Sequence, residues 1–272
     1  AVFAIIDEAR AAERVADLSG VVFPAGISFE RYANDANGLP EILFIRARFS
    51  GETRFTGAVF GGRTSFDQAA FEDYAWFNEA AFRGDASFDE AKFTRSALFD
   101  KAIFDNDVGF NRAAIGGMAR FTEVKFGAAS FEGTSFPEDT WFDGVIFRGP
   151  ASFGGATFAG DAWFDKACFM SGALFTRAAF HRVYFQEARF HHHVLFDGAG
   201  FGDYASFMNA RFDRRAFFNG SGATASEGST FGFADFTGAK FGGLAQFNNR
   251  KFLDTTVFSG ASFERAPEFH GA

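Results

Sequence analysis

The chain has 272 residues and a formal net charge of −8, with 26 Lys and Arg against 34 Asp and Glu. This acidic balance disfavours general binding to nucleic-acid phosphates. A lone cysteine, Cys168, excludes an intrachain disulfide, and no apolar run approaches the roughly 18 residues of a membrane-spanning helix. We therefore expect no direct nucleic-acid binding, no membrane span in this chain and a cytoplasmic location. Because the chain starts with Ala1 and not Met, we also expect a processed or excised piece.

Two segments are predicted within the first 43 residues. Residues 4–17 contain strong helix formers and neither Gly nor Pro, and Gly20 supplies a stop signal, so we predict a helical cap within residues 1–20. Such a cap would cover the backbone and apolar side chains at the open end of a repeat array. Phe23 and Phe29 are six residues apart and predict a partial first coil and a loop within residues 21–43.

Phenylalanine accounts for 45 of the 272 residues, and from Phe44 onward it recurs at alternating steps of five and six. A small or β-branched residue lies two positions before each Phe, which places both side chains on one face of a short extended segment. Gly, Asp and Asn, which favour turns, often follow. Burying one Phe side chain is worth about 1.5–3 kcal/mol, so the Phe side chains are expected to fill a shared core. The steps do not match a helical period, and we predict a winding solenoid of short strands and turns.

Runs such as Ala86-Ser87-Phe88-Asp89-Glu90 and Ala91-Lys92-Phe93-Thr94-Arg95 resemble the pentapeptide-repeat family. The resemblance covers about residues 42–269. It implies an all-β, right-handed quadrilateral β-helix with one pentapeptide on each side. This chain departs from the family pattern because every second step contains a sixth residue, so we expect looser turns on two sides.

Four units give a coil of 22 residues, about ten coils in all, within a solenoid domain spanning residues 44–272. One Phe column of this register contains Phe44, Phe66, Phe88, Phe110, Phe131, Phe153, Phe175, Phe196, Phe218, Phe247 and Phe269. A six-residue step shortens to five before Phe131 and before Phe185. An insertion near residues 219–230 predicts a surface loop. Arg250 occupies an inward slot for a small residue, so it must be paired or extend outward, and we expect a local distortion there.

The residue before the Phe on one side of the coil points outward and forms an aromatic column. This predicted partner-binding column contains Trp76, Leu98, Trp141, Trp163 and Tyr184. Exposed apolar patches and Trp or Tyr clusters mark interaction surfaces, which indicates a protein partner or self-association, for example as a dimer. The alternative is that these side chains stack between coils and stabilise the sheet alone.

A second predicted site is a cationic patch for an anion or an acidic partner. Its members are Arg189, His191, His192, His193, Arg211, Arg214 and Arg215. Adjacent histidines alternate in direction and rarely form a preorganised metal site by themselves. We therefore predict neither a metal nor another cofactor.

The favoured function is a non-enzymatic interaction scaffold, because no phosphate loop, paired-cysteine motif or zinc motif occurs. The family resemblance supplies an alternative, a DNA mimic that binds a type II topoisomerase such as gyrase. That function needs a long anionic strip. Partial acidic columns contain Asp67, Asp89 and Glu132 on one side and Asp100, Asp143 and Asp165 on another. Asn111, Lys101 and Lys166 interrupt them, which favours a mixed solvated surface.

Overall fold

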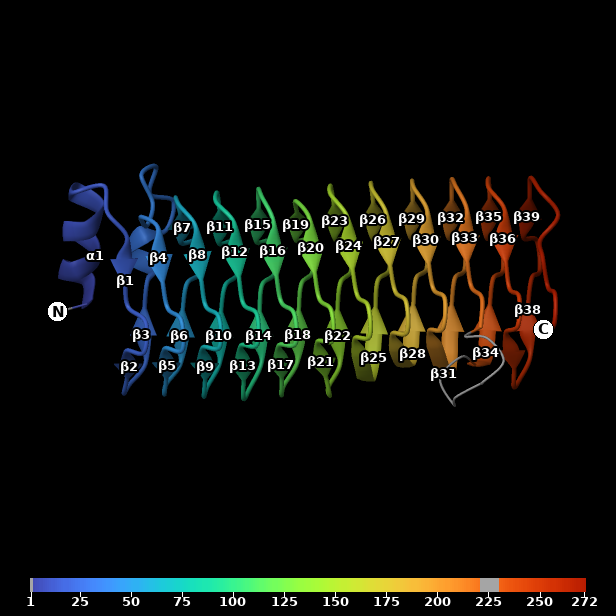
Figure 1. Ribbon diagram of the computed structural model, residues 1–272, viewed down its shortest axis with the longest axis horizontal. Helices are drawn as coiled ribbons and strands as arrows, with labels where there is room; N and C mark the ends of the chain where they lie inside the picture. The colour runs from blue at the N-terminus through green and yellow to red at the C-terminus, as the bar shows by residue number, and fades with distance from the viewer. Residues whose placement is uncertain (1, 221–229) are drawn as a thin grey trace.

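The computed structural model describes residues 2–220 and 230–272 as a β-solenoid of about eleven coils, with parallel strands stacked along a rod (Figure 1). Each coil has four sides, called here faces 1 to 4 in chain order. Within the described ranges, no helix is long and apolar enough to cross a bilayer. The fold predicted from the Phe spacing is confirmed, while most of the predicted inserted loop lies outside the described residues.

The strands of faces 1 and 4 are two residues long. Face 1 contains β1 (Ala16–Asp17), β4 (Ile42–Leu43), β8 (Thr64–Ser65), β12 (Ala86–Ser87), β16 (Val108–Gly109), β20 (Ala129–Ser130), β24 (Ala151–Ser152), β27 (Ala173–Leu174), β30 (Val194–Leu195), β33 (Ala216–Phe217) and β36 (Ala245–Gln246). Face 4 contains β7 (Val59–Phe60), β11 (Ala81–Phe82), β15 (Ile103–Phe104), β19 (Lys125–Phe126), β23 (Ile146–Phe147), β26 (Cys168–Phe169), β29 (Arg189–Phe190), β32 (Arg211–Phe212), β35 (Lys240–Phe241) and β39 (Ser262–Phe263).

Faces 2 and 3 merge where longer strands run around their common corner. Face 2 contains β2 (Val22–Phe23), β5 (Arg48–Phe49), β9 (Ala70–Phe71), β13 (Lys92–Phe93), β17 (Ala114–Ile115), β21 (Ser135–Phe136) and β37 (Lys251–Phe252). Face 3 contains β3 (Ile27–Ser28), β6 (Thr53–Arg54), β10 (Ala75–Trp76), β14 (Ala97–Leu98), β18 (Ala119–Arg120), β22 (Thr140–Trp141) and β38 (Thr256–Val257). The strands that serve both faces are β25 (Thr157–Trp163), β28 (Ala179–Tyr184), β31 (Gly200–Ser206) and β34 (Thr230–Asp235).

The N-terminal helix is shorter than predicted. Helix α1 spans Val2–Ala11, Glu13 adopts a left-handed backbone with φ of 51°, and β1 already pairs with β4. The prediction of a helix to residue 17 was therefore wrong. The ring of Phe3 packs edge-on against Phe29 at a centroid distance of 5.5 Å, so α1 covers the first coil of the aromatic core (Figure 1). The predicted loop also contains a short 3-10 helix, η1 (Glu30–Tyr32).

The core consists of stacked Phe rings, as the register predicted. In the Phe column of face 1, Phe66 and Phe88 stack at 4.9 Å with an interplanar angle of 9°, while Phe88 meets Phe99 of another face edge-on at 5.5 Å. Phe218 stacks on Phe247 at 5.0 Å, so the column continues past the insertion. Stacked and edge-on pairs contribute about 0.5–1.5 kcal/mol beyond the burial of apolar area.

The turns differ between the two kinds of corner. At a five-residue corner, the Ala91 N–H donates to the Phe88 carbonyl at 3.1 Å, and Glu90 between them is left-handed with φ of 58°. The Glu90 N–H then donates to the Asn111 carbonyl of the next coil at 2.8 Å. No such turn-closing bond spans a six-residue corner in the described part of the chain, which confirms the looser turns. The extra residue in β25 relative to β28 forms a bulge.

Arg250 is fully buried, and its guanidinium extends along the inside of the rod. It donates hydrogen bonds to the carbonyls of Phe218 at 2.7 Å, Phe196 at 2.9 Å and Ala199, and lies 4.9 Å from the ring centroid of Phe231. Burial lowers the pKa of Arg250 to about 10, so the group stays cationic at neutral pH. The predicted pairing is therefore made by backbone carbonyls of the two preceding coils.

Candidate functional site

An aromatic ladder runs along the outside of face 3 and its corner with face 2. Trp141 stacks on Trp163 at 5.0 Å, and Trp163 stacks on Tyr184 at 5.6 Å, with ring planes within 7° of parallel. The row of rings continues to Tyr204 at 5.6 Å, where the ring planes are tilted by 42°, and Tyr204 stacks on Phe233 at 5.5 Å. These five residues are called the aromatic ladder below. Their rings are half-buried, because each covers its neighbours.

The sequence prediction missed the last two members of the ladder. Tyr204 pairs with Arg182, whereas Tyr184 pairs with Ser206, so the ladder moves sideways from face 3 to the corner. Tyr204 and Phe233 each lie three residues before a core Phe, a position that the outward column did not include. Two aromatic residues at equivalent corner positions of successive coils were the signal that could have identified them.

The predicted aromatic column is interrupted in its N-terminal part. Leu98 and Arg120 separate Trp76 from Trp141 in the strand register. Arg120 forms an ion pair with Asp100 at 3.1 Å. Leu98 is only 7 % exposed, because the larger side chains of Trp76 and Arg120 flank it, so it offers little surface to a partner. Leu98, which was predicted as a contact residue, is therefore the most covered member of the predicted column.

The charged groups beside the aromatic ladder are paired, and the Tyr184 hydroxyl is not ionised. Arg182 lies 3.8 Å from the carboxylate of Asp161, which balances the two charges next to Tyr184. Burial, with the nearby Asp161 charge, raises the pKa of Tyr184 above its ordinary value. The phenol is therefore neutral at physiological pH and can donate or accept a hydrogen bond at the surface.

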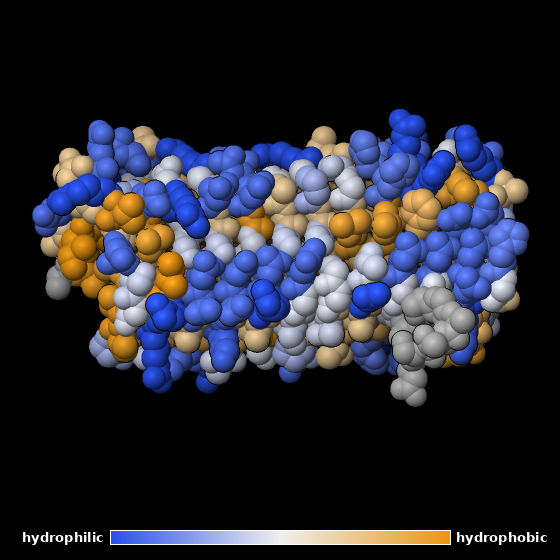
Figure 2. All heavy atoms as spheres, viewed as in Figure 1, coloured by the Kyte–Doolittle hydropathy of each residue, from blue (hydrophilic) through white to orange (hydrophobic). Residues whose placement is uncertain are grey.

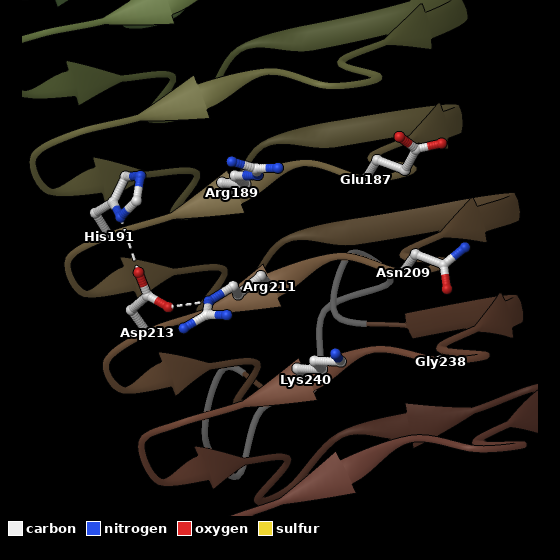
Figure 3. Close-up of a pocket in the computed structure, with 8 residues that line it drawn as sticks. All are labelled: Glu187, Arg189, His191, Asn209, Arg211, Asp213, Gly238 and Lys240. Carbon is white, nitrogen blue, oxygen red and sulfur yellow. Dashed lines mark hydrogen bonds and ion pairs between the residues drawn. The ribbon is translucent and has the colours of Figure 1, made fainter.

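A cationic hollow of about 460 Å³ lies on face 4 near the C-terminal end (Figure 3). Its central column is Arg189, Arg211 and Lys240, which occupy paired positions of β29, β32 and β35. Arg211 donates to Asp213 at 2.5 Å, and the His191 ring nitrogen lies 2.8 Å from the same carboxylate. Burial alone would raise the pKa of Asp213, but its bonds with Arg211 and His191 hold the pKa below its ordinary range.

The remaining members of the predicted cationic patch occupy the adjacent corner between faces 4 and 1. His192, His193, Arg214 and Arg215 are all exposed there and are called the basic corner below. The Arg215 N–H donates to the His193 ring at 3.3 Å. The structure thus places the seven predicted residues on neighbouring coils. It adds Lys240, which lies far from the histidines in sequence but pairs in strand register with Arg211 of the preceding coil.

The predicted acidic columns are engaged in local interactions. In face 1, Asn111 donates to Asp89 at 3.1 Å and Ser152 donates to Glu132 at 2.8 Å. Near face 3, Asp143 and Asp165 line a second hollow of about 460 Å³. Burial and the charge of Asp165 raise the pKa of Asp143 to about 6. In residues 2–220 and 230–272, no three His, Cys, Asp or Glu side chains gather in a way that could hold a metal ion.

Parallel strands, short turns and a filled core together define a β-solenoid repeat protein. The family model for pentapeptide repeats, described as nine copies, matches residues 44–92, 88–135 and 131–179, which together span half of the chain. The chain therefore belongs to the pentapeptide-repeat family, whose members are generally protein-interaction scaffolds and not enzymes. A comparison with curated proteins gave no match.

Proposed function

We propose that this protein is a non-enzymatic scaffold that binds a partner protein through the aromatic ladder. The observation that carries the proposal is the external row of aromatic contacts from Trp141 to Phe233, which are stacked except at the tilted contact between Tyr184 and Tyr204. Five rungs spaced by roughly 4.8 Å present a strip about 19 Å long. This length suits a segment of a partner, and the ring edges, the indole N–H groups and the tyrosine hydroxyls combine apolar contact with hydrogen bonding.

The competing explanation is that the ladder only stabilises the sheet. Cross-strand aromatic pairs do contribute, by roughly 0.2–1 kcal/mol per pair. Stabilisation alone does not require aromatic residues, because the outward positions of face 1 in the earlier coils are filled by Ser65, Ser87 and Ser130. The rod tolerates small polar residues at such positions, which favours a role for the rings outside the fold.

The test is a double variant, Trp141→Ser with Trp163→Ser, and a matched control, Ile146→Ser with Cys168→Ser, in the same two coils on face 4. Proteins captured from cell extract by wild type and both variants are compared quantitatively, with circular dichroism to show that each rod is folded. We expect a partner retained by wild type and control but lost by the Trp variant. Equal capture by all three folded proteins would contradict the proposal.

Self-association through the ladder is tested with the same proteins. Light scattering gives the mass of wild type and of each variant, and a dimer formed by this surface should dissociate only in the Trp variant. All three tryptophans of the chain lie in the predicted column. Because Trp76 lies outside the aromatic ladder, acrylamide quenching of a Trp76→Phe variant reports directly on whether a bound partner, or a second copy, covers Trp141 and Trp163.

The DNA-mimic alternative receives less support. Its anionic strip would need free carboxylates, whereas Asp89 accepts hydrogen bonds from Asn111 and Asp100 pairs with Arg120. The cationic hollow and the basic corner add opposite charge to the same rod. A gyrase supercoiling assay tests this function, and we expect neither inhibition nor protection at a large excess of the protein.

A further inference from the structure

The outward surface of face 1 changes character near its C-terminal end. Leu174, Leu195 and Phe217 occupy paired outward positions of β27, β30 and β33 and are called the apolar stripe below. Figure 2 shows apolar side chains gathered over β27 and β30, with hydrophilic side chains along the neighbouring edge. Leu174 is 39 % exposed, and the other two are half-buried. The stripe is separate from the aromatic ladder, which lies on face 3.

A shallow hollow extends the stripe toward earlier coils. It has a volume of about 230 Å³ and is lined mainly by Ala128, Ala129, Pro150, Ala151 and Leu174. The hollow lies where the step before Phe131 contains five residues in place of six. Apolar side chains therefore continue beside the stripe into earlier coils, together with Asp107, Ser130 and Ser152, which also line the hollow.

Positive charge borders the stripe along one edge. Arg214 and Arg215 of the basic corner are exposed, as are Arg189 and Lys240 on face 4. None of these four forms an ion pair with a residue in the described ranges. Many other arginines of the rod do pair with carboxylates, for example Arg48 with Glu72. Cations without an ion pair in the described ranges therefore lie beside the apolar stripe, although the chain has a net charge of −8.

We propose that the apolar stripe and the basic corner together bind an acidic, amphipathic protein segment. Its aliphatic or aromatic side chains would lie on Leu174, Leu195 and Phe217, and its carboxylates would face Arg214 and Arg215. Charge complementarity selects this class of partner, because a neutral apolar segment would leave the cations unpaired and a purely acidic one would leave the stripe exposed. The opposite edge of the stripe carries Asp197, which disfavours a segment with acids on both edges.

The experiment uses fluorescence anisotropy with three labelled peptides of equal length. The first alternates Glu and Leu, the second Glu and Ser, and the third Gln and Leu. We expect saturable binding of the Glu–Leu peptide alone, weakened as NaCl rises from about 50 to 500 mM, because exposed charges are screened. Preferential binding of the Gln–Leu peptide, or no binding of any peptide, would overturn the proposal.

Variants locate the binding. Arg214→Glu with Arg215→Glu changes only exposed side chains and should weaken binding at least about tenfold. Lys92→Glu with Lys125→Glu makes the same change in net charge at two exposed positions on other strands, β13 and β19, and should leave binding unchanged. Leu195→Ser with Phe217→Ser should also weaken it about tenfold, with circular dichroism as the check on folding. An equal loss in the Lys92/Lys125 control, or sedimentation with phosphatidylserine vesicles without peptide binding, would overturn the proposal.

Discussion

The earlier and later coils of face 1 bury the same kinds of inward side chain but carry different kinds of outward side chain. In the earlier coils the outward residues include Ser87, Ser130 and Ser152, and their hydroxyls donate to polar side chains of the preceding coil. In the later coils the corresponding residues are Leu174, Leu195 and Phe217, before Gln246 ends the column. The inward positions do not change, since both halves bury a small or β-branched residue and a Phe.

This contrast shows which residues the fold constrains. Inward side chains must stack between coils, whereas outward side chains need only fit a flat parallel sheet. A polar ladder that satisfies its own hydrogen bonds has little left to offer a partner. An apolar stripe or an aromatic ladder retains surface that a partner can cover.

The largest expected effect tests whether the Phe core is packed equally well in the earlier and the later coils. Phe88→Ala and Phe196→Ala remove fully buried rings from the same column in the two halves. Each should lower the free energy of unfolding by about 3–5 kcal/mol, because a cavity replaces stacked contacts. Urea denaturation measures this. A loss below about 1 kcal/mol in either variant would contradict equivalent packing.

Arg250→Ala should have the next largest effect. Alanine is the usual residue in this inward column, so a simple repeat argument predicts a gain in stability. We expect instead a loss of about 2–4 kcal/mol, because the carbonyls of Phe196, Ala199 and Phe218 lose a buried charged donor. Arg177→Ala, at an exposed turn, is the control and should change stability by less than about 0.5 kcal/mol.

Asp143→Asn should remove a loss of stability that the wild-type protein suffers as the pH rises. The raised pKa of about 6 means that the folded protein holds this proton more tightly than the unfolded chain does. Ionisation therefore destabilises the rod progressively between about pH 4 and pH 6 and fully above that range. The variant should be more stable than wild type by roughly 1 kcal/mol at pH 8, a value reduced by solvent screening. The gain should vanish near pH 4.

The smallest expected effects compare how much the outward side chains of the earlier and the later coils of face 1 contribute to stability. Ser87→Ala breaks the hydrogen bond to Asp67 and should lower stability by about 0.5–1.5 kcal/mol. Leu195→Ser removes a half-buried outward side chain and should cost about 1 kcal/mol or less, because much of its area already faces water. Thermal unfolding of the two variants decides this. A much larger loss for Leu195→Ser would mean that the apolar stripe serves the fold.

The inward half of the structure could be predicted from the sequence because Phe spacing alone sets the register. Trp141, Trp163 and Tyr184 were placed correctly on one column by the same rule. The ladder's turn toward Tyr204 could not be predicted, because it depends on which residues pair across a bulged corner. The strand at Ala16–Asp17 carries no Phe, so the pattern did not mark it.

Arg250 and Leu98 illustrate a second limit. The sequence indicated that Arg250 must be paired, but its acceptors lie in earlier coils and are backbone carbonyls, which no side-chain pattern records. Leu98 was placed outward by register, yet the size of its neighbours buries it. The apolar stripe was within reach, since the rule that found the tryptophans also assigns Leu174, Leu195 and Phe217 to one outward column.

The most direct test of the central claim replaces the apolar outward residues in the later coils of face 1 with serine, the residue found at such positions in the earlier coils. A triple variant, Leu174→Ser, Leu195→Ser and Phe217→Ser, is compared with wild type for both urea unfolding and binding of the Glu–Leu peptide. If outward residues determine binding and inward residues determine the fold, the variant should keep its cooperative unfolding, with a loss below about 3 kcal/mol, and bind at least about tenfold more weakly. Unfolding of the rod, or a folded rod that binds the peptide as wild type does, would contradict the account.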